Sequence, residues 1–293
     1  MIGFTILVLK TTKMYINKMP LNITPVTNHR EREKGNIVYP VYSRRSGGLS
    51  VGINLFPLKK YCTFDCPYCE VFPFSGNAEF SPEQTENDLR SCLAEAHLQN
   101  TPVKDICFSG NGEPTLSPVF GEALKLAGKI RAQAAASAEL VLITNGTGLL
   151  QPHVFSILQS AANGSLTLNI WLKLDAGTSE WYQKINRSNI AFEKLASKIK
   201  EFTSCAPVTI QTMLCSINAE TPSNEEAAAW ETLVCETAAN GKIRKVQIYG
   251  KVRPAPEDPL ASPLPAGYLE DRAASLRRVF AEKSISTPVE VYL

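Results

Sequence analysis

The sequence predicts an α/β protein built on a parallel sheet whose strands are joined by crossover helices. Segments that suit β-strands alternate with segments of helical periodicity six times along the chain, as expected of repeated β–α–β units. The length of 293 residues suits one large domain of this class. Polar, glycine-rich or ionisable residues follow the expected strands, at the edge where such sheets carry their ligands. The alternation by itself allows either an open doubly wound sheet or a curved, incomplete barrel.

The expected strands are short runs of β-branched, aromatic and aliphatic residues. They span residues 36–42, 51–56, 103–108, 140–143, 166–174, 208–214, 245–249 and 289–292. The first expected helix begins at residue 81 or 82. The later ones span residues 117–136, 153–160, 191–202, 224–239 and 268–283.

Two helix starts carry a capping signal. Ser81 can cap, Pro82 fits the first turn, and Gln84 stands at the capping-box position. Ser117 and Pro118 repeat the pair of capping residue and proline. Within the first helix, apolar residues recur at helical spacing and supply a buried face.

Composition limits the classes of protein that this chain can belong to. Hydrophobic residues make up 44% and charged residues 20%, which is ordinary for a globular protein with a sizeable core. The net charge of +2 is too small to indicate a nucleic-acid binder by itself. The apolar run 2–9 is far shorter than a membrane span of about 20 residues. We expect residues 1–35 to be an extension, as an edge strand or a flexible segment, and residues 36–293 to form the core domain.

Three cysteines, Cys62, Cys66 and Cys69, follow the expected strand 51–56 at a C-x3-C-x2-C spacing. Closely spaced thiolates of this kind hold iron–sulfur clusters. A structural zinc site needs four ligands, and the sequence has no second C-x-x-C or C-x-x-H pair. Three thiols on a four-iron cluster leave one iron open. The alternatives are a zinc knuckle that borrows a distant cysteine, or three unrelated buried thiols.

The remaining cysteines need no special chemistry. Most have apolar neighbours, where a free cysteine behaves as a small hydrophobic residue. They are Cys92, Cys107, Cys205, Cys215 and Cys235. Cys215, at the end of a strand, either donates a hydrogen atom in the reaction or only packs against its neighbours. A cluster requires reduced thiols, so we expect a cytoplasmic protein.

Other polar residues stand at strand ends or inside strands. Lys173 and Asp175 alternate with apolar neighbours and therefore face one side of their strand. Burying these charged groups costs free energy unless they are paired with each other or bind a ligand. Gln211 and Gln247 suit either a ligand or a buried amide network. The basic, glycine-rich turn 43–48 either binds an anion or is simply exposed to solvent. The same two alternatives apply to four basic residues expected near the mouth of the site: Lys184, Arg187, Lys251 and Arg253.

The cysteine spacing, with Tyr68 before the last cysteine, resembles the radical S-adenosylmethionine (SAM) superfamily. The resemblance implies a partial (β/α)6 TIM-like barrel and a [4Fe–4S] cluster on Cys62, Cys66 and Cys69, with SAM on the fourth iron. It also implies reductive cleavage of SAM and a 5′-deoxyadenosyl radical that abstracts hydrogen from a substrate. Such a cluster needs an external one-electron donor, which we expect to be flavodoxin- or ferredoxin-like.

The resemblance extends to the residues that would seat SAM. The segment 109–114 resembles the superfamily's Gly-Gly-Glu segment, whose backbone and glutamate hold the SAM amino group, and Thr144 with Asn145 resembles the ribose-contacting position. The SAM-binding residues implied in this way are Tyr68, Gly110, Asn111, Gly112, Glu113, Pro114, Thr144, Asn145, Lys173 and Asp175.

Three segments, 108–116, 184–187 and 246–254, resemble a narrower group, the iron–sulfur oxidoreductases similar to tRNA wybutosine-synthesising enzymes. Those tRNA enzymes carry further cysteines upstream, and this sequence has none before Cys62. The substrate is therefore open. The alternatives are a tRNA-modifying enzyme of the wyosine type, with tRNA as partner, or a non-catalytic iron–sulfur or metal-binding module.

Overall fold

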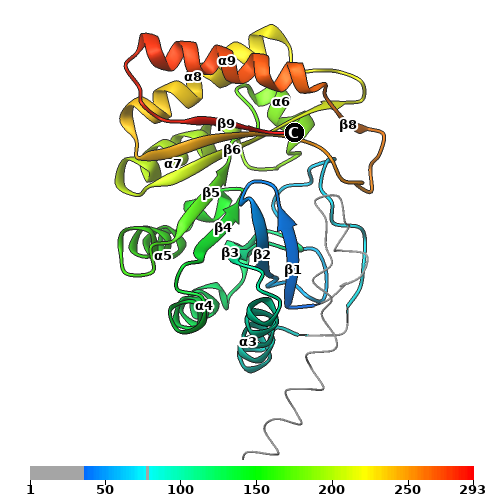
Figure 1. Ribbon diagram of the computed structural model, residues 1–293. Helices are drawn as coiled ribbons and strands as arrows, with labels where there is room; N and C mark the ends of the chain where they lie inside the picture. Colours follow the sequence, from blue (N-terminus) through cyan, green and yellow to red (C-terminus); the bar gives the residue numbers. More distant parts are fainter. Residues whose placement is uncertain (1–35, 77–78) are drawn as a thin grey trace, which may run out of the picture.

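A curved, mostly parallel sheet forms the centre of the protein (Figure 1). The computed structural model describes residues 36–76 and 79–293, so the expected extension 1–35 lies outside the described residues. Consecutive parallel strands lie side by side in chain order. They are β2 (Gly48–Ile53), β3 (Val103–Phe108), β4 (Glu139–Thr144), β5 (Asn169–Lys173), β6 (Val208–Ile217) and β7 (Ile243–Gly250).

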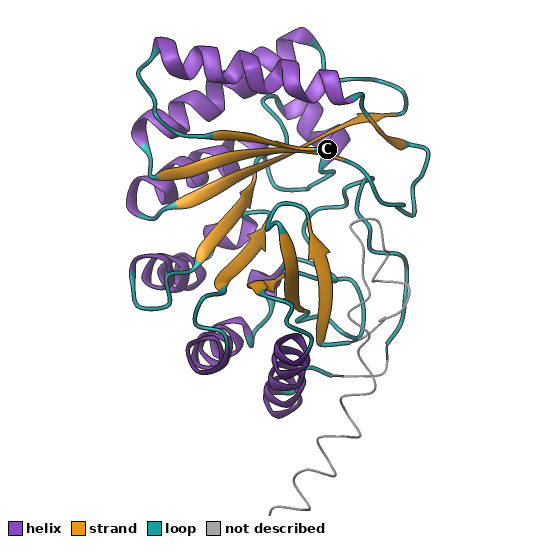
Figure 2. Cartoon of the chain, in the orientation of Figure 1, coloured by secondary structure: helices purple, strands orange, loops and turns teal. Residues whose placement is uncertain are grey.

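Helices cover the convex face of this sheet, which curls into a half-barrel (Figure 2). The curved, incomplete barrel, rather than the open doubly wound sheet, is therefore the fold. The helices are α3 (Pro82–Leu98), α4 (Phe120–Ala134), α5 (Pro152–Asn163), α6 (Ser179–Ile185), α7 (Phe192–Cys205), α8 (Asn224–Asn240) and α9 (Ala266–Glu282). Two 3-10 turns, η1 (Pro114–Leu116) and η2 (Thr147–Leu150), follow β3 and β4.

Three strands extend the sheet beyond the β–α–β units. β1 (Val38–Ser43) pairs antiparallel with β2 and forms one edge. β9 (Val289–Tyr292) pairs parallel with β7 at the other edge, which confirms that the last strand extends the sheet. The short β8 (Ala261–Pro263) pairs antiparallel with β6.

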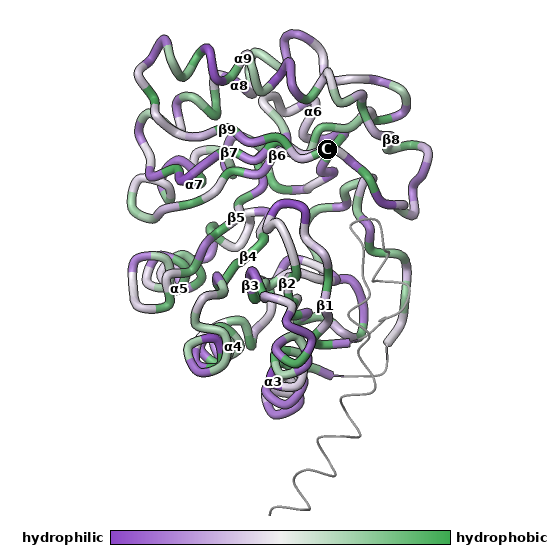
Figure 3. Tube along the Cα trace, viewed as in Figure 1, coloured by the Kyte–Doolittle hydropathy of each residue, from purple (hydrophilic) through white to green (hydrophobic). Residues whose placement is uncertain are grey.

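The two faces of the sheet bury different side chains. Residues such as Ile106, Phe108 and Leu140 face the helices and belong to the main core. The alternate residues Cys107 and Val141 face the interior of the half-barrel, where they form a small separate cluster with Trp171 and Ile143. Figure 3 shows both hydrophobic and hydrophilic colours along the strands and along the helices that cover them. The interior of the half-barrel is thus left with room for polar groups.

The helix-start predictions are confirmed in part. The Gln84 N–H donates to the Ser81 hydroxyl (3.2 Å), as a capping serine requires. The Gln84 side chain, however, donates to Asp88 instead of turning back to Ser81. The second prediction is wrong by two residues, because α4 begins at Phe120 and has no side-chain cap. Ser117 instead ends the η1 turn, where its N–H donates to the Pro114 carbonyl oxygen.

Two elements were not predicted from the sequence. α6 has only seven residues, too few for a periodicity to show, although Thr178 caps it by accepting from the Trp181 N–H (3.2 Å). β8 has three residues. Among the described residues, none of the helices is both long enough and apolar enough to cross a membrane.

We predict that Phe202→Ala lowers the free energy of unfolding by about 3–5 kcal/mol, because it empties a fully buried site. The Phe202 ring on α7 meets the Phe155 ring of α5 edge-on, with centroids 5.0 Å apart. Urea denaturation measures the loss. Lys194→Ala, at an exposed position of the same helix, is the control, and an equal effect of the two substitutions would contradict the packing described here.

Candidate active site

The three cysteines of the loop after β2 line one cavity of about 250 Å³ at the carboxyl ends of the strands. Cys62, Cys66 and Cys69 are each half-buried, and none forms a disulfide. Seven of the ten predicted SAM-binding residues line the same cavity: Tyr68, Gly110, Gly112, Glu113, Thr144, Asn145 and Lys173. The other three, Asn111, Pro114 and Asp175, are not among the residues that line it. The sequence-based prediction that these strand ends meet in space is therefore confirmed.

The loop after β3 holds the chain just before the first cysteine. The Tyr61 N–H donates to the Asn111 carbonyl oxygen (3.0 Å), and the Glu113 N–H donates to the Tyr61 carbonyl oxygen (2.9 Å). A Cβ atom on Gly112 would lie 1.9 Å from the Tyr61 oxygen, so this contact requires a glycine. Gly110 has a φ of +125°, and a Cβ atom there would meet the Asn54 side chain at 2.8 Å.

The Glu113 carboxylate joins the ends of β3 and β4. It is 2% exposed and accepts four hydrogen bonds, from the N–H and hydroxyl of Thr115, the hydroxyl of Thr144 (2.7 Å) and the N–H of Asn145 (2.7 Å). Burial raises the pKa of Glu113, and these hydrogen bonds oppose the rise. A carboxylate has about four lone-pair sites. The carboxylate of Glu113 is therefore used inside the chain. Its main chain is used there as well, because its N–H donates to Tyr61 and its carbonyl oxygen accepts from the Leu116 N–H.

Asn145 connects β4 to the cysteine loop. Its side-chain amide donates to the Thr63 hydroxyl (3.0 Å) and to the Cys62 sulfur (3.5 Å). The Phe64 N–H also donates to the Cys62 sulfur (3.4 Å). Hydrogen bonds to cysteine sulfurs are among the features that tune iron–sulfur clusters.

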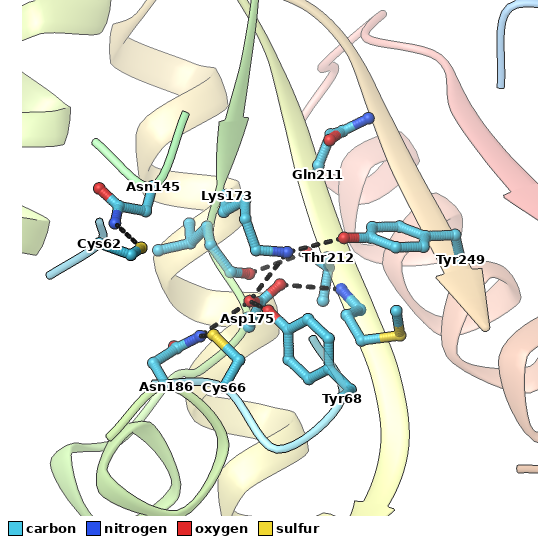
Figure 4. Close-up of polar contacts among 12 residues, drawn as sticks. Cys62, Cys66, Tyr68, Asn145, Lys173, Asp175, Asn186, Gln211, Thr212 and Tyr249 are labelled. Atoms are coloured by element: carbon cyan, nitrogen blue, oxygen red, sulfur yellow. Dashed lines mark hydrogen bonds and ion pairs between the residues drawn. The ribbon is translucent and has the colours of Figure 1, made fainter. Parts of the chain in front are cut away.

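Asp175 is the centre of a second buried network (Figure 4). Its Oδ2 atom lies 3.2 Å from the Lys173 ammonium and accepts hydrogen bonds from the Tyr68 hydroxyl (2.5 Å) and the Asn186 amide (2.9 Å). Its Oδ1 atom accepts from the Met213 N–H (2.9 Å) on β6. Lys173 and Asp175 thus face one side of the strand and are paired with each other, as the cost of burying them requires.

The network around Asp175 fixes the charge states of its members. Burial lowers the pKa of Lys173, but Asp175 together with Tyr249 and other neighbours outweighs this effect, so the net pKa lies above its ordinary value and the ammonium is charged. Burial and Asp175 raise the pKa of Tyr68, so the phenol stays neutral and donates. The Lys173 ammonium also donates to the Tyr249 hydroxyl (2.7 Å).

Asn186 was not predicted as a site residue. Its amide donates to the Cys66 sulfur at 3.5 Å as well as to Asp175, and its carbonyl oxygen accepts from the Asp65 N–H (2.9 Å). Asn186 lies in the segment 184–187, which resembles a narrower family group, but the sequence predicted a role only for the basic residues of that segment. Other residues that line the cavity without having been predicted to bind SAM include Arg45, Cys107, Ser109, Trp171, Met213 and Tyr249.

The open alternatives at the other residues are now decided by their contacts. Gln211 and Gln247 form a buried amide network, with the Gln211 Nε2 donating to the Gln247 Oε1 (2.7 Å). Cys215 is fully buried and does not line the cavity. Each of the four basic residues predicted near the mouth has an acidic partner: Lys184 with Glu220, Arg187 with Glu257, Lys251 with Asp258 and Arg253 with Glu70.

The donor set fits an iron–sulfur cluster better than a single ion. In the described part of the chain, no three His, Cys, Asp or Glu side chains gather closely enough to hold one metal ion. The three thiols nevertheless surround one cavity, as expected when each binds a different iron of a cluster. Burial raises the pKa of Cys62 to about 12 and that of Cys66 to about 11, so both thiols are protonated until a metal displaces the proton.

We predict that Gly112→Ala reduces the retention of iron by roughly tenfold, because the added methyl group displaces Tyr61 and the cysteine loop after it. Iron bound per chain after anaerobic reconstitution and desalting measures the effect. Gly267→Ala is the matched control, since a Cβ atom there meets nothing within 4 Å. Equal iron contents in the two variants would show that the contact does not position the loop.

We predict that Glu113→Gln lowers the free energy of unfolding by about 1–3 kcal/mol. The Asn145 N–H now donates to the Glu113 carboxylate, and the side-chain amide N–H of the glutamine would face this donor instead. Chemical denaturation compares it with Glu83→Gln at an exposed position of α3. If both substitutions have the same small effect, Glu113 is not the joint between β3 and β4 that its contacts indicate.

Comparisons with known proteins identify the family of the chain. The family model of the radical SAM superfamily matches residues 57–227. A UPF0026 protein of Synechocystis is 33% identical over 187 residues, which are 60% of this chain and 63% of that protein. A protein named GTPase Obg from Brachyspira hyodysenteriae is 29% identical over 192 residues, 63% of this chain and 26% of that protein. The chain thus spans less than two thirds of the length of these relatives.

The fold also matches solved structures. The crystal structure of Streptococcus suis SuiB bound to S-adenosylmethionine superimposes with a TM-score of 0.62 and 12% sequence identity, over 85% of this chain and 52% of that chain. At this identity the match concerns the fold alone. Since the family model covers more than half of the chain, from before the first cysteine into α8, the protein belongs to the radical SAM superfamily.

Proposed function

We propose that this protein is a radical SAM enzyme in which Cys62, Cys66 and Cys69 bind a [4Fe–4S] cluster and SAM occupies the adjoining cavity. When bound, these groups would supply reductive cleavage of SAM to methionine and a 5′-deoxyadenosyl radical, which removes a hydrogen atom from a substrate. The observation that carries the proposal is the shared cavity. Three free thiols from one loop, two glycines of the loop after β3 and a charged lysine of β5 all line it.

The residues around the cavity have separable roles in this proposal. The Lys173 ammonium lines the cavity and is held charged by Asp175, so it can pair with a carboxylate of SAM or substrate. Gly110 and Gly112 bring backbone close to the cysteine loop, where their carbonyl oxygens can accept from an ammonium group. The buried rings of Phe64 and Tyr68 help to exclude water from the reacting atoms.

The proposal requires a source of single electrons, and we propose an external flavodoxin- or ferredoxin-like donor. A [4Fe–4S] cluster that cleaves SAM must lie toward the negative end of the roughly −700 to +450 mV range of protein clusters. The cysteine loop presents Leu58 and Tyr61, which are 41% and 53% exposed, as contacts for such a donor. A reducing compartment such as the cytoplasm would keep the thiols free.

Two alternatives have less support. Membership of the group similar to tRNA wybutosine-synthesising enzymes rests on the segments 108–116, 184–187 and 246–254. A tRNA substrate would favour unpaired basic residues at the mouth, but Arg187 is paired with Glu257 (2.8 Å) and Arg253 with Glu70 (3.2 Å). A non-catalytic cluster module would not need a charged lysine that lines the cavity beside the thiols. We therefore favour an enzyme that acts on a substrate other than tRNA.

We predict that Cys66→Ala abolishes the formation of 5′-deoxyadenosine from SAM, because one of the three iron-binding thiols is lost. Product analysis after anaerobic reconstitution and reduction with dithionite measures this. Cys205→Ala, which removes a half-buried thiol at the end of α7, is expected to keep the activity of the unmodified protein. A Cys66→Ala protein that still forms the product would refute the assignment.

A further inference from the structure

We propose that the interior of the half-barrel binds an oxyanion, a carboxylate or phosphate group, at Arg45. The identification of this oxyanion as part of the substrate rests on the proposed function, whereas the binding site itself does not. Arg45 lies in the turn between β1 and β2 and lines the same cavity as the three cysteines. The sequence indicated an anion or solvent at this turn, and the contacts of Arg45 favour the anion.

Arg45 is positioned by neutral groups. Its guanidinium carbon lies 4.4 Å from the centre of the Tyr249 ring and 5.6 Å from that of Trp171, as in cation–π contacts. Its Nη1 atom donates to the Oε1 atom of the buried Gln211 (3.1 Å). A guanidinium carries five N–H donors. Within residues 36–76 and 79–293 this is its one hydrogen bond, so most of its donors are unused.

Among the described residues, Arg45 has no ion-pair partner, whereas two other cations of the cavity do. Lys173 is paired with Asp175 at 3.2 Å and Arg253 with Glu70 at 3.2 Å. For Arg45, no carboxylate of the described residues comes within ion-pair distance. Asp105, on β3, accepts a hydrogen bond from Ser50 (2.5 Å) instead. A partly buried guanidinium with unused donors and no carboxylate is expected to bind an anion.

Two neighbours strengthen this expectation. Arg44 also lines the cavity, and within the described part of the chain it donates to two backbone carbonyl oxygens, those of Gly250 and Leu293. Burial, together with the positive charges of Arg253 and Arg45, lowers the pKa of Arg44, and an anion between the arginines would relieve that repulsion. The indole N–H of Trp171, whose ring faces Arg45, is buried and has no acceptor among the described residues. An oxyanion would supply acceptors that this part of the cavity lacks.

The position of Arg45 also orients the molecule that carries the anion. Arg45 contacts Trp171 and Tyr249, and Tyr249 in turn accepts from Lys173 at the SAM end of the cavity. A small molecule with its oxyanion on Arg45 would therefore point its remaining atoms toward the cysteine loop.

The test is direct binding by isothermal titration calorimetry, with inorganic phosphate and succinate as separate probes at constant ionic strength. The full chain is used after anaerobic reconstitution with iron and sulfide. We expect one of the two oxyanions to bind the unmodified protein, and Arg45→Met to weaken that binding at least about tenfold, as the loss of a charge-assisted contact implies. Arg45→Lys keeps the charge, so its oxyanion affinity is expected to lie between those of the unmodified protein and Arg45→Met. Arg278→Met, at an exposed position of α9, is the control.

The outcomes separate this proposal from the proposed function. Phosphate binding that depends on Arg45 indicates a phosphorylated ligand, and succinate binding that depends on it indicates a carboxylate. Formation of 5′-deoxyadenosine from SAM by the unmodified protein is measured separately, and oxyanion binding that depends on Arg45 supports the site whatever that measurement gives. If the unmodified protein binds neither oxyanion, or if Arg45→Met and Arg45→Lys bind as tightly as it does, the site is overturned, whether or not SAM is cleaved.

Discussion

The position of the cysteine loop depends on a backbone contact that only glycine permits. Tyr61 pairs with the segment 111–113 through two main-chain hydrogen bonds, and Gly112 provides the space for them. The loop has little regular structure of its own, so its geometry must come from the strands beneath it. Because Cys62 follows Tyr61 directly, the end of β3 sets where the first thiol lies.

From this contact, the buried polar groups form two connected sets around the cavity. Glu113 ties the end of β3 to Thr144 and Asn145 at the end of β4, and Asn145 reaches the Cys62 sulfur. Asp175 ties β5 to β6, and through Asn186 it reaches the Cys66 sulfur. Each carboxylate is costly to bury and is stabilised by several donors. Two of the three thiols are thus oriented by side chains whose own positions are fixed by the sheet.

The distribution of charge divides the cavity into two parts. Near the cysteines, the Lys173 ammonium is paired with Asp175, so this end of the cavity holds charges of both signs. Deeper in the half-barrel, Arg45 has aromatic rings and an amide as neighbours, and no carboxylate of the described residues pairs with it. This difference supports the proposed assignment of the first part to SAM and of the second to the substrate.

Much of the fold and the identity of the cysteine site could be predicted from sequence, because both depend on local patterns. Strand–helix alternation gave the parallel sheet, and the spacing of Cys62, Cys66 and Cys69 indicated their shared role. The connection from Asn186 to Cys66 spans 120 residues and could not be predicted from spacing. Nor could the sequence tell that Glu113 makes all its hydrogen bonds inside the chain, or that Arg45 reaches Gln211 across the half-barrel.

The most direct test of the central claim is the electron paramagnetic resonance spectrum of the anaerobically reconstituted, dithionite-reduced protein, recorded with and without SAM. Three protein thiols on a four-iron cluster leave one iron for SAM, so the account predicts the spectrum of a reduced [4Fe–4S] cluster that changes when SAM is added. A cluster spectrum that is the same with and without SAM would contradict it, because a fourth protein ligand would then close the site.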